Sequence, residues 1–146
     1  MLSLQGVLML LAACSQAATS TPTTPASGAS ITGIVWQWTS VTNQTTKETT
    51  TVPNPENYTI TFKDNDTLEG KADCNTFSGT YSQENGFSIK LGATTMMSCG
   101  DASFDQHYLQ LLGSVAAGGP DGQGNLALET AGGEQRMLFN NGGAAK

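Results

Sequence analysis

Apolar and polar residues alternate in short blocks through most of the chain beyond the first thirty residues. The block "IVWQWTSV" places Trp36 and Trp38 on one face at a period of two, and "YTITFKD" places Tyr58, Ile60 and Phe62 on one face in the same way. Such alternation is typical of antiparallel strands with one face toward the core and one toward solvent. We therefore expect an antiparallel sheet.

Further blocks continue this pattern as hairpins. "TLEGKADC", "FSGTYS" and "GFSIKLG" read as strands, and the connecting "KDNDT" and "QENG" have the composition of tight turns. "NLALET" and "EQRMLFN" form a last hairpin across "AGG", after the turn-rich "GGPDGQG". Gly70 and Gly79 fall in mid-strand on inward faces, which indicates tight bending or the close approach of a large neighbour such as an indole.

Two segments depart from the alternating pattern. The stretch at 42–57, "TNQTTKETTTVPNPEN", is polar and carries two prolines, so we expect a loop rather than a core strand. "SFDQHYLQLLGSV" instead has a helical period. Ser103 and Gln106 fit a capping box, and Gly113 is a natural end for the helix. The apolar residues of this expected helix are Phe104, Tyr108, Leu111, Leu112 and Val115.

Together these elements predict an α+β domain over residues 31–146. Its expected form is a small curved or partly closed antiparallel β-sheet of about seven to eight strands with one packed α-helix. The chain has 146 residues and 12% charged residues, with 17 glycines, which suits a single turn-rich β domain.

The charge pattern narrows the range of partners. The net charge is −6, and the six lysine and arginine residues are scattered along the chain. Because no basic cluster is present to replace phosphate counterions, we expect no nucleic-acid partner. A net charge of this size keeps a domain soluble and says little else about function.

The N-terminal stretch "MLSLQGVLMLLAACSQ" has the character of a signal sequence. Its apolar run is shorter than the roughly 20 residues that cross a bilayer as a helix. The run ends in Leu-Ala-Ala-Cys14, which resembles the bacterial lipobox, although no lysine or arginine precedes it. We expect residues 1–13 to be a lipoprotein signal peptide and Cys14 to be the lipid attachment site. An ordinary secretory signal with a chance cysteine is the alternative.

Residues 14–30 then read as a tether. They are rich in serine, threonine, proline and alanine and lack bulky apolar residues, so they cannot bury enough surface to offset the entropy of ordering. The expected protein is thus exported and membrane-anchored through Cys14, and its domain faces the periplasm or the cell exterior.

The order of the blocks resembles the META domain family, which includes HslJ-like bacterial lipoproteins. The resemblance covers about residues 31–140 and rests on Trp36 in the first strand, on "YTITFKDNDTLEGKADCNTFSGTY" and on "TTMMSC". The residues that match the family's motifs, besides the two cysteines, are Trp36, Asn75, Gly79, Tyr81, Thr95 and Met97. The resemblance implies an envelope-associated accessory domain linked to stress tolerance, without an established catalytic activity or cofactor.

Cys74 and Cys99 are the two cysteines that remain after the expected cleavage and lipidation. An even number in an exported domain favours a disulfide, with Cys74 and Cys99 each at the end of a strand. Buried free thiols and a nucleophilic cysteine are alternatives, and a nucleophile would need a nearby base. The single histidine, His107, lies away from the apolar stripe of the helix and is expected to be exposed. One histidine and two cysteines are too few ligands for a zinc site.

Other candidate sites have simpler structural explanations. "DNDTLEG" lacks the ligand spacing of an EF-hand loop and is explained by a hairpin turn, and "GGPDGQGN" lacks the lysine of a phosphate-binding loop. Trp36, Trp38, Met96 and Met97 could line a ligand groove, but core packing is the usual role of such residues. We expect neither a metal nor a cofactor.

The expected function is a non-catalytic, lipid-anchored envelope protein with an accessory binding or stress-tolerance role and an unidentified envelope protein as partner. An alternative is a protease-inhibitor or chaperone-like module that engages an exported protein through a strand edge or the 42–57 loop. A thiol enzyme is a third hypothesis, and it requires a reactive cysteine.

Overall fold

The computed structural model describes residues 30–146, so the expected signal peptide and Cys14 lie outside the described residues. The described part contains nine strands, one α-helix and two short 3-10 helices. The strands are β1 (Ile34–Asn43), β2 (Thr49–Thr51), β3 (Tyr58–Phe62), β4 (Thr67–Ala72), β5 (Asn75–Ser82), β6 (Ser88–Thr94), β7 (Val115–Pro120), β8 (Leu126–Thr130) and β9 (Gln135–Ala144). The helices are η1 (Pro55–Asn57), α1 (Asp105–Gly113) and η2 (Ala131–Gly133).

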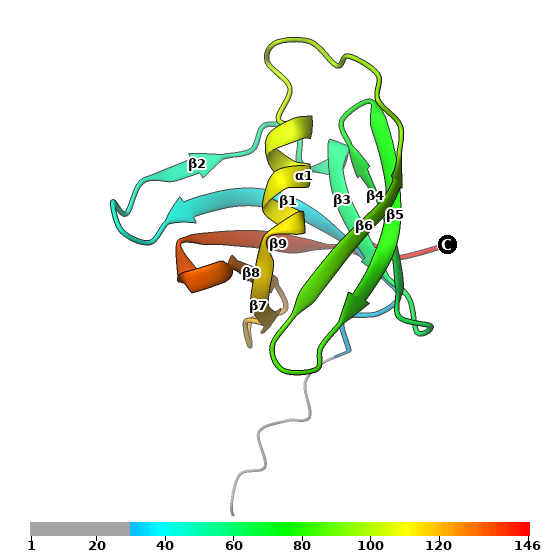
Figure 1. The fold of residues 1–146 in the computed structure, drawn as a ribbon, viewed down its shortest axis with the longest axis vertical. Coiled ribbons are helices and arrows are strands. Elements are labelled where there is room, and N and C mark those ends of the chain that lie inside the picture. The colour runs from blue at the N-terminus through cyan, green and yellow to red at the C-terminus, as the bar shows by residue number, and fades with distance from the viewer. Residues whose placement is uncertain (1–29) are drawn as a thin grey trace, which may run out of the picture.

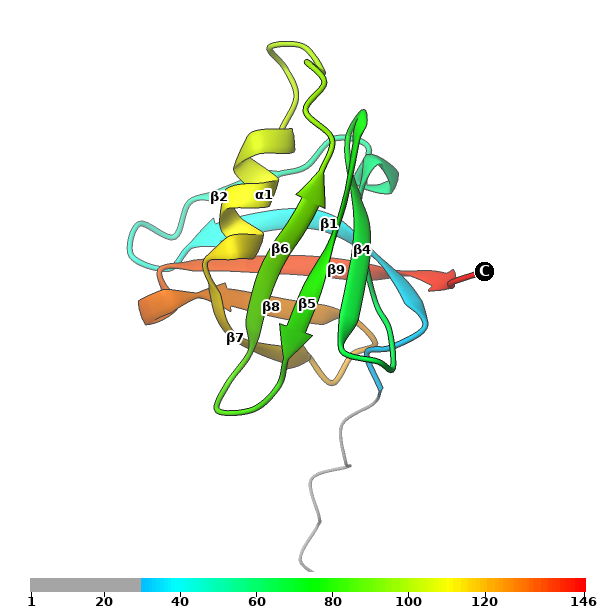
Figure 2. The same ribbon diagram turned by 45° about the vertical axis from the view of Figure 1, so that its right-hand side comes forward.

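Eight strands form one antiparallel sheet in the order β6-β5-β4-β3-β1-β9-β8-β7, and β2 is a short addition to β1. The sheet is strongly curled, and α1 stands beside its open side between β6 and β7 (Figures 1 and 2). Below the helix the two edges meet, where the Phe87 N–H donates to the Ala116 carbonyl at 3.0 Å. The predicted α+β class and partly closed antiparallel sheet are therefore confirmed.

Aromatic side chains fill the space between the sheet and α1. Trp38 and Tyr108 are both fully buried and stack with their ring centroids 4.9 Å apart, and Tyr58 meets Tyr108 edge-on. The residues that the alternating pattern placed on one face, such as Ile60 and Phe62, belong to this same core. Edge-to-face and offset aromatic pairs contribute beyond the area they bury, so this cluster fixes α1 against the sheet.

The helix ends at Gly113, as predicted, but its start differs from the prediction. It begins at Asp105 and ends at Gly113, and the N-cap residue is Phe104, which makes no side-chain capping bond. The predicted capping box is wrong, because the Ser103 hydroxyl accepts from the Asp105 N–H instead of from Gln106. Val115 remains buried but is the first residue of β7. An apolar position can thus serve the core from either element, and the period alone does not place the boundary.

Strands occur in two segments that the sequence pattern assigned to a turn or a loop. β7 includes the start of the "GGPDGQG" run, and it lies at an edge of the sheet, where glycine and a terminal proline interrupt few ladder hydrogen bonds. The 42–57 stretch contains the end of β1, the exposed β2 and η1, and its Val52 side chain is buried. The one strand that lies wholly within the stretch, β2, is outside the core, but the stretch is more structured than a polar loop.

The two mid-strand glycines make room for close neighbours. At Gly79 a side chain would collide with the Lys90 carbonyl oxygen on β6, next to a register shift between Phe77 and Gly79. At Gly70 it would collide with the Phe77 ring and the Thr59 carbonyl. The close neighbours are therefore backbone and a phenyl ring, not the indole that the sequence suggested.

Candidate functional site

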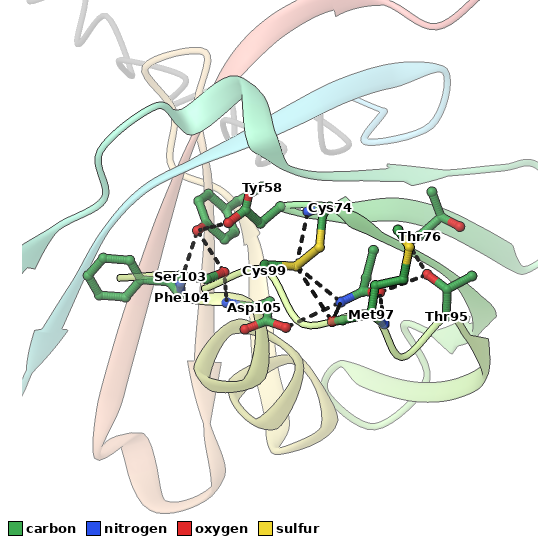
Figure 3. Close-up of a disulfide and its surroundings, with 11 residues drawn as sticks. Tyr58, Cys74, Thr76, Thr95, Met97, Cys99, Ser103, Phe104 and Asp105 are labelled. Carbon is green, nitrogen blue, oxygen red and sulfur yellow. Dashed lines mark hydrogen bonds between the residues drawn. A yellow bond between two sulfur atoms is a disulfide. The ribbon is translucent and has the colours of Figure 1, made fainter. Parts of the chain in front are cut away.

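Two connecting segments meet at one end of the sheet. Asp73 and Cys74 form the two-residue turn between β4 and β5, and residues 95–104, which we call the 95–104 loop, lead from β6 to α1. A disulfide between Cys74 and Cys99 joins them, with a Cα–Cα distance of 5.6 Å (Figure 3). Neither cysteine ends a strand, contrary to the prediction, because Cys74 lies in the turn and Cys99 lies five residues beyond the last residue of β6.

Asn75 is the polar centre of this contact. Its Oδ1 accepts from the Met97 N–H at 2.7 Å, and its Nδ2 donates to the Met97 carbonyl at 3.0 Å, so the side-chain amide pairs with Met97 as a strand backbone would. Oδ1 also accepts from the Thr95 hydroxyl at 3.0 Å, and Nδ2 lies 3.3 Å from both Cys99 Sγ and Asp105 Oδ2. Asn75 is 2% exposed, so these bonds replace water at a buried amide.

Tyr58 holds the other end of the 95–104 loop. Its buried ring belongs to the core, and its hydroxyl accepts from the Phe104 N–H at 2.9 Å. The same hydroxyl lies within 3.5 Å of Ser103 Oγ and 3.4 Å of Asp73 Oδ2 (Figure 3). Because Asn75, Tyr58 and the disulfide act on different residues of the loop, a segment without regular secondary structure is fixed at several points.

The loop presents two large apolar side chains to solvent. Met96 is 84% exposed and Met97 is 59% exposed, and they are the exposed large hydrophobic residues of the part of the chain described here. The preferred interpretation of the methionine pair as core is therefore wrong, whereas Trp36 and Trp38 are core residues as expected. Both methionines lie beyond Thr94, the last residue of β6, in a segment without regular secondary structure.

A hollow of about 630 Å³ lies between the 95–104 loop and the outer face of α1. We call it the methionine groove, and its lining includes Met96, Met97, Asp101, Asp105, His107 and Leu109. Its charged residues are acidic, with no lysine or arginine among the described residues that line it. The groove thus combines apolar thioethers with negative charge, a combination suited to a segment that is both apolar and basic.

The other candidate sites suggested by the sequence have structural roles in the described residues. Within residues 30–146, no group of three or more histidine, cysteine, aspartate or glutamate side chains is placed to hold a metal ion. His107 is exposed, as predicted, and its ring is tilted against Trp38 at a centroid distance of 6.2 Å. The "DNDTLEG" run forms the β3–β4 hairpin, where Lys63 and Glu69 are paired at 2.6 Å.

The structure thus brings together five of the residues singled out from the sequence, namely Cys74, Asn75, Thr95, Met97 and Cys99. Trp36, Gly79 and Tyr81 lie elsewhere. The Trp36 indole donates to the Ile31 carbonyl at 2.9 Å, and the Tyr81 hydroxyl donates to the Lys63 carbonyl at 2.9 Å. Burial raises the pKa of Tyr81, and Asp66 and Asp64 add to the shift.

Sequence reasoning missed the polar contributions of Tyr58, Ser103 and Asp105. Tyr58 was expected only to pack, since the alternating pattern reports the direction of a side chain and not the fate of its hydroxyl. Ser103 was assigned to a helix cap. No signal in the sequence marks a hydroxyl whose partners lie about forty-five residues away, as in the bond from Phe104 N to Tyr58.

Comparison with known proteins gives a family and a fold. A family model described as "META domain" matches residues 29–142. No curated protein matches the chain. An NMR structure of a protein from Burkholderia xenovorans has a TM-score of 0.61 at 17% identity, covering 76% of this chain and 83% of that one. A crystal structure of a DUF4847 family protein from Bacteroides vulgatus has a TM-score of 0.60 at 13% identity, covering 80% and 96%. At these identities the likeness concerns the fold alone.

Proposed function

The chain belongs to the META domain family, and on that premise we propose that it is a non-catalytic, lipid-anchored accessory protein of the cell envelope that binds an exported polypeptide. Its domain would serve stress tolerance by holding this partner at the membrane surface, through Cys14 and the tether that follows it. The methionine groove would be the binding site. Within residues 30–146, no helix is long and apolar enough to cross a membrane.

One observation carries the proposal. Met96 and Met97 are exposed to solvent on the 95–104 loop. Asn75, Tyr58 and a disulfide fix this loop in place. Exposed methionine side chains gain free energy when a partner covers them, and their flexible thioethers adapt to varied apolar surfaces. Because the loop is already ordered, binding would lose little conformational entropy. The acidic lining selects an apolar segment that also carries lysine or arginine.

Site-specific photo-crosslinking in cells of the source organism tests the groove. A photoreactive residue replaces Met96 in one version of the full chain, and Glu84, which is exposed in the β5–β6 turn, in a matched control. We expect a discrete crosslinked species from position 96 that is absent from position 84. The same set of adducts from both positions, or none from position 96, would contradict the proposal.

A second candidate function, binding of a peptide at a strand edge, is tested by the same crosslinking experiment. β2 pairs only with β1 among the described strands, and its three residues are exposed, so it offers a strand edge to an incoming peptide. A photoreactive residue at Thr50 reports on that edge. Crosslinks from Thr50 without crosslinks from position 96 would favour the protease-inhibitor or chaperone-like module over the groove.

The lipid anchor has its own test. Metabolic labelling with a palmitate analogue should mark the native chain and not the Cys14→Ala variant. Label that persists in the variant would show that the cysteine is not the attachment site. The crosslinking result does not depend on this outcome, because the groove lies wholly within the described domain.

A further inference from the structure

The Cys74–Cys99 disulfide lies outside the core that holds the fold together. Cys74 is exposed in its turn and Cys99 is half-buried, and neither belongs to the cluster of buried residues. Breaking the S–S bond therefore removes no core contact. The aromatic packing of Trp38, Tyr58 and Tyr108 is unaffected, so we expect the domain to stay folded when the disulfide is reduced.

The two sulfur atoms have different surroundings. Cys99 Sγ accepts from the Cys74 backbone N–H at 3.3 Å and from Asn75 Nδ2 at 3.3 Å. Among residues 30–146, no such donor contacts Cys74 Sγ. Hydrogen bonds from N–H groups favour negative charge on the sulfur that receives them, and a sulfur with a lower thiol pKa leaves faster in disulfide exchange. Attack at the exposed Cys74 with Cys99 as the leaving group is the favoured direction.

We propose that Cys74 is a site of reversible thiol–disulfide exchange with an exported dithiol, either a small molecule or the paired cysteines of an oxidoreductase. This goes beyond the proposed function and does not depend on it. A thiolate of the dithiol attacks Cys74 Sγ, the Cys74–Cys99 bond breaks, and the electron pair leaves on Cys99 Sγ, which then takes up a proton. The second thiolate of the dithiol attacks the mixed disulfide and releases Cys74. The dithiol is oxidised to a disulfide, and the protein gains two thiols.

The surrounding contacts make the step reversible. The hydrogen bonds that Asn75 shares with Met97 and Thr95 do not involve sulfur, so they can keep the 95–104 loop beside the β4–β5 turn after reduction. Cys74 and Cys99 then remain close enough to be re-oxidised without a rearrangement of the backbone. Reduction would thus remove the covalent link beside the methionine groove while the hydrogen bonds that position the loop persist.

Carboxylates near the disulfide determine which small thiols react with it fastest. Asp73 precedes Cys74, and the Asp105 carboxylate shares Asn75 Nδ2 with Cys99 Sγ. Asp101 also lines the adjoining groove, where the described residues include no lysine or arginine. Negative charge opposes both an anionic attacking thiol and a departing thiolate. A cationic monothiol such as cysteamine should therefore react faster than glutathione.

The experiment measures which of the two cysteines forms the mixed disulfide with an added thiol. The full chain carrying Cys14→Ser retains Cys74 and Cys99 as its cysteines. It is incubated with cysteamine without denaturant, quenched with acid, alkylated and mapped by mass spectrometry. We expect the cysteamine adduct on Cys74 to exceed that on Cys99 about tenfold. We also expect the rate to rise in proportion to the thiol concentration and the circular dichroism of the fully reduced protein to match that of the native protein.

Two outcomes would overturn the proposal. Equal adducts on both cysteines, or an excess on Cys99, would show that the contacts around Cys99 Sγ do not direct the exchange. A rate that is independent of thiol concentration would show that the disulfide is reached only through prior unfolding, which makes it a structural cross-link.

A matched pair of variants separates the local effect from net charge. With the uncharged thiol 2-mercaptoethanol as the probe, Asp105→Asn removes the carboxylate near Cys99 Sγ and keeps an oxygen that can accept from Asn75, so the exchange rate should rise about threefold. Asp66→Asn makes the same change of charge in the β3–β4 turn, at a left-handed position that asparagine tolerates, and should leave the rate unchanged. Equal acceleration by both variants would count against Cys99 as the leaving group.

Discussion

At the scale of single residues, the buried side-chain amide of Asn75 both donates and accepts hydrogen bonds. Its oxygen and its nitrogen both bond to the backbone of Met97, and the nitrogen also reaches Cys99 Sγ and Asp105. A carboxylate of the same shape has no donor, and alanine has neither donor nor acceptor. The Cys-Asn pair of the sequence is therefore one covalent and one hydrogen-bonded anchor for the same loop.

Asn75→Asp should lower the free energy of unfolding by about 3 kcal/mol, because it places a carboxylate against the Met97 carbonyl and the Asp105 carboxylate inside the protein. Urea denaturation measures the change. Thr76→Ala, one residue along β5 and exposed, is the control and should stay within about 0.5 kcal/mol of the native protein. If the two variants are equally stable, Asn75 does not hold the loop.

Two tyrosines show how a hydroxyl can stabilise or destabilise the same core. The Tyr58 hydroxyl bonds to the Phe104 N–H, whereas the Tyr108 hydroxyl is the one buried side-chain polar atom of the described residues without a hydrogen-bond partner. Tyr108→Phe should raise the free energy of unfolding by about 1 kcal/mol, and Tyr58→Phe should lower it by a similar amount. Thermal and urea unfolding measure both. A loss of stability in Tyr108→Phe would mean that its hydroxyl does find a partner.

At the scale of elements, β5 and β6 pair closely because of a glycine. A Cβ at Gly79 would meet the Lys90 carbonyl oxygen, whereas a Cβ at Gly92 on the facing strand would lie 3.4 Å from the Ser78 carbonyl oxygen, an ordinary contact. The same chemical change therefore has different consequences on two paired strands.

Gly79→Ala should lower the free energy of unfolding by about 1–3 kcal/mol, since the backbone of β6 must shift to admit the methyl group. Gly92→Ala is the matched control and should change it by less than about 0.5 kcal/mol. The midpoint of urea unfolding measures both variants. Equal midpoints for the two variants would rule out the steric account of Gly79.

At the scale of the whole molecule, the curled sheet and the single helix enclose the Tyr108 phenol completely. Burial raises the pKa of the Tyr108 phenol well above its ordinary value. The folded protein then keeps the phenol proton at a pH where the unfolded chain releases it. The contribution of this protonated phenol to stability is fully present below the pKa of tyrosine in the unfolded chain. It is lost as the pH rises from that value toward the pKa in the folded protein.

The free energy of unfolding should therefore be constant up to about pH 9 and fall above about pH 10, by up to about 1.4 kcal/mol per pH unit for Tyr108. Urea denaturation of the Cys14→Ser chain between pH 8 and pH 11 measures this dependence. The Tyr108→Phe variant should show a shallower fall. A variant that follows the native curve throughout would remove Tyr108 as the cause.

The class of fold could be predicted from the sequence because it depends on local alternation. A strand with one buried face shows its period in a few residues, so Trp36 and Trp38, or Phe87 and Ile89, identify their face without knowledge of their partners. The edge strand β7 escaped prediction, since its glycines and proline carry a turn signal and only pairing with β8 makes it a strand. The apolar period of the helix likewise ran on to Val115, which pairing with β8 makes the first residue of β7.

The site was determined by contacts between residues far apart in the chain. The sequence by itself determined the alternating faces, the pairing of Cys74 with Cys99 as the favoured arrangement, and the residues that match the META domain family. Only the tertiary structure decided that Met96 and Met97 face solvent, that Asn75 replaces a strand partner for Met97, and that Tyr58 anchors the far end of the loop. The physical reason is that a side chain's direction follows from its own backbone, whereas its hydrogen-bond partners depend on how the whole sheet curls.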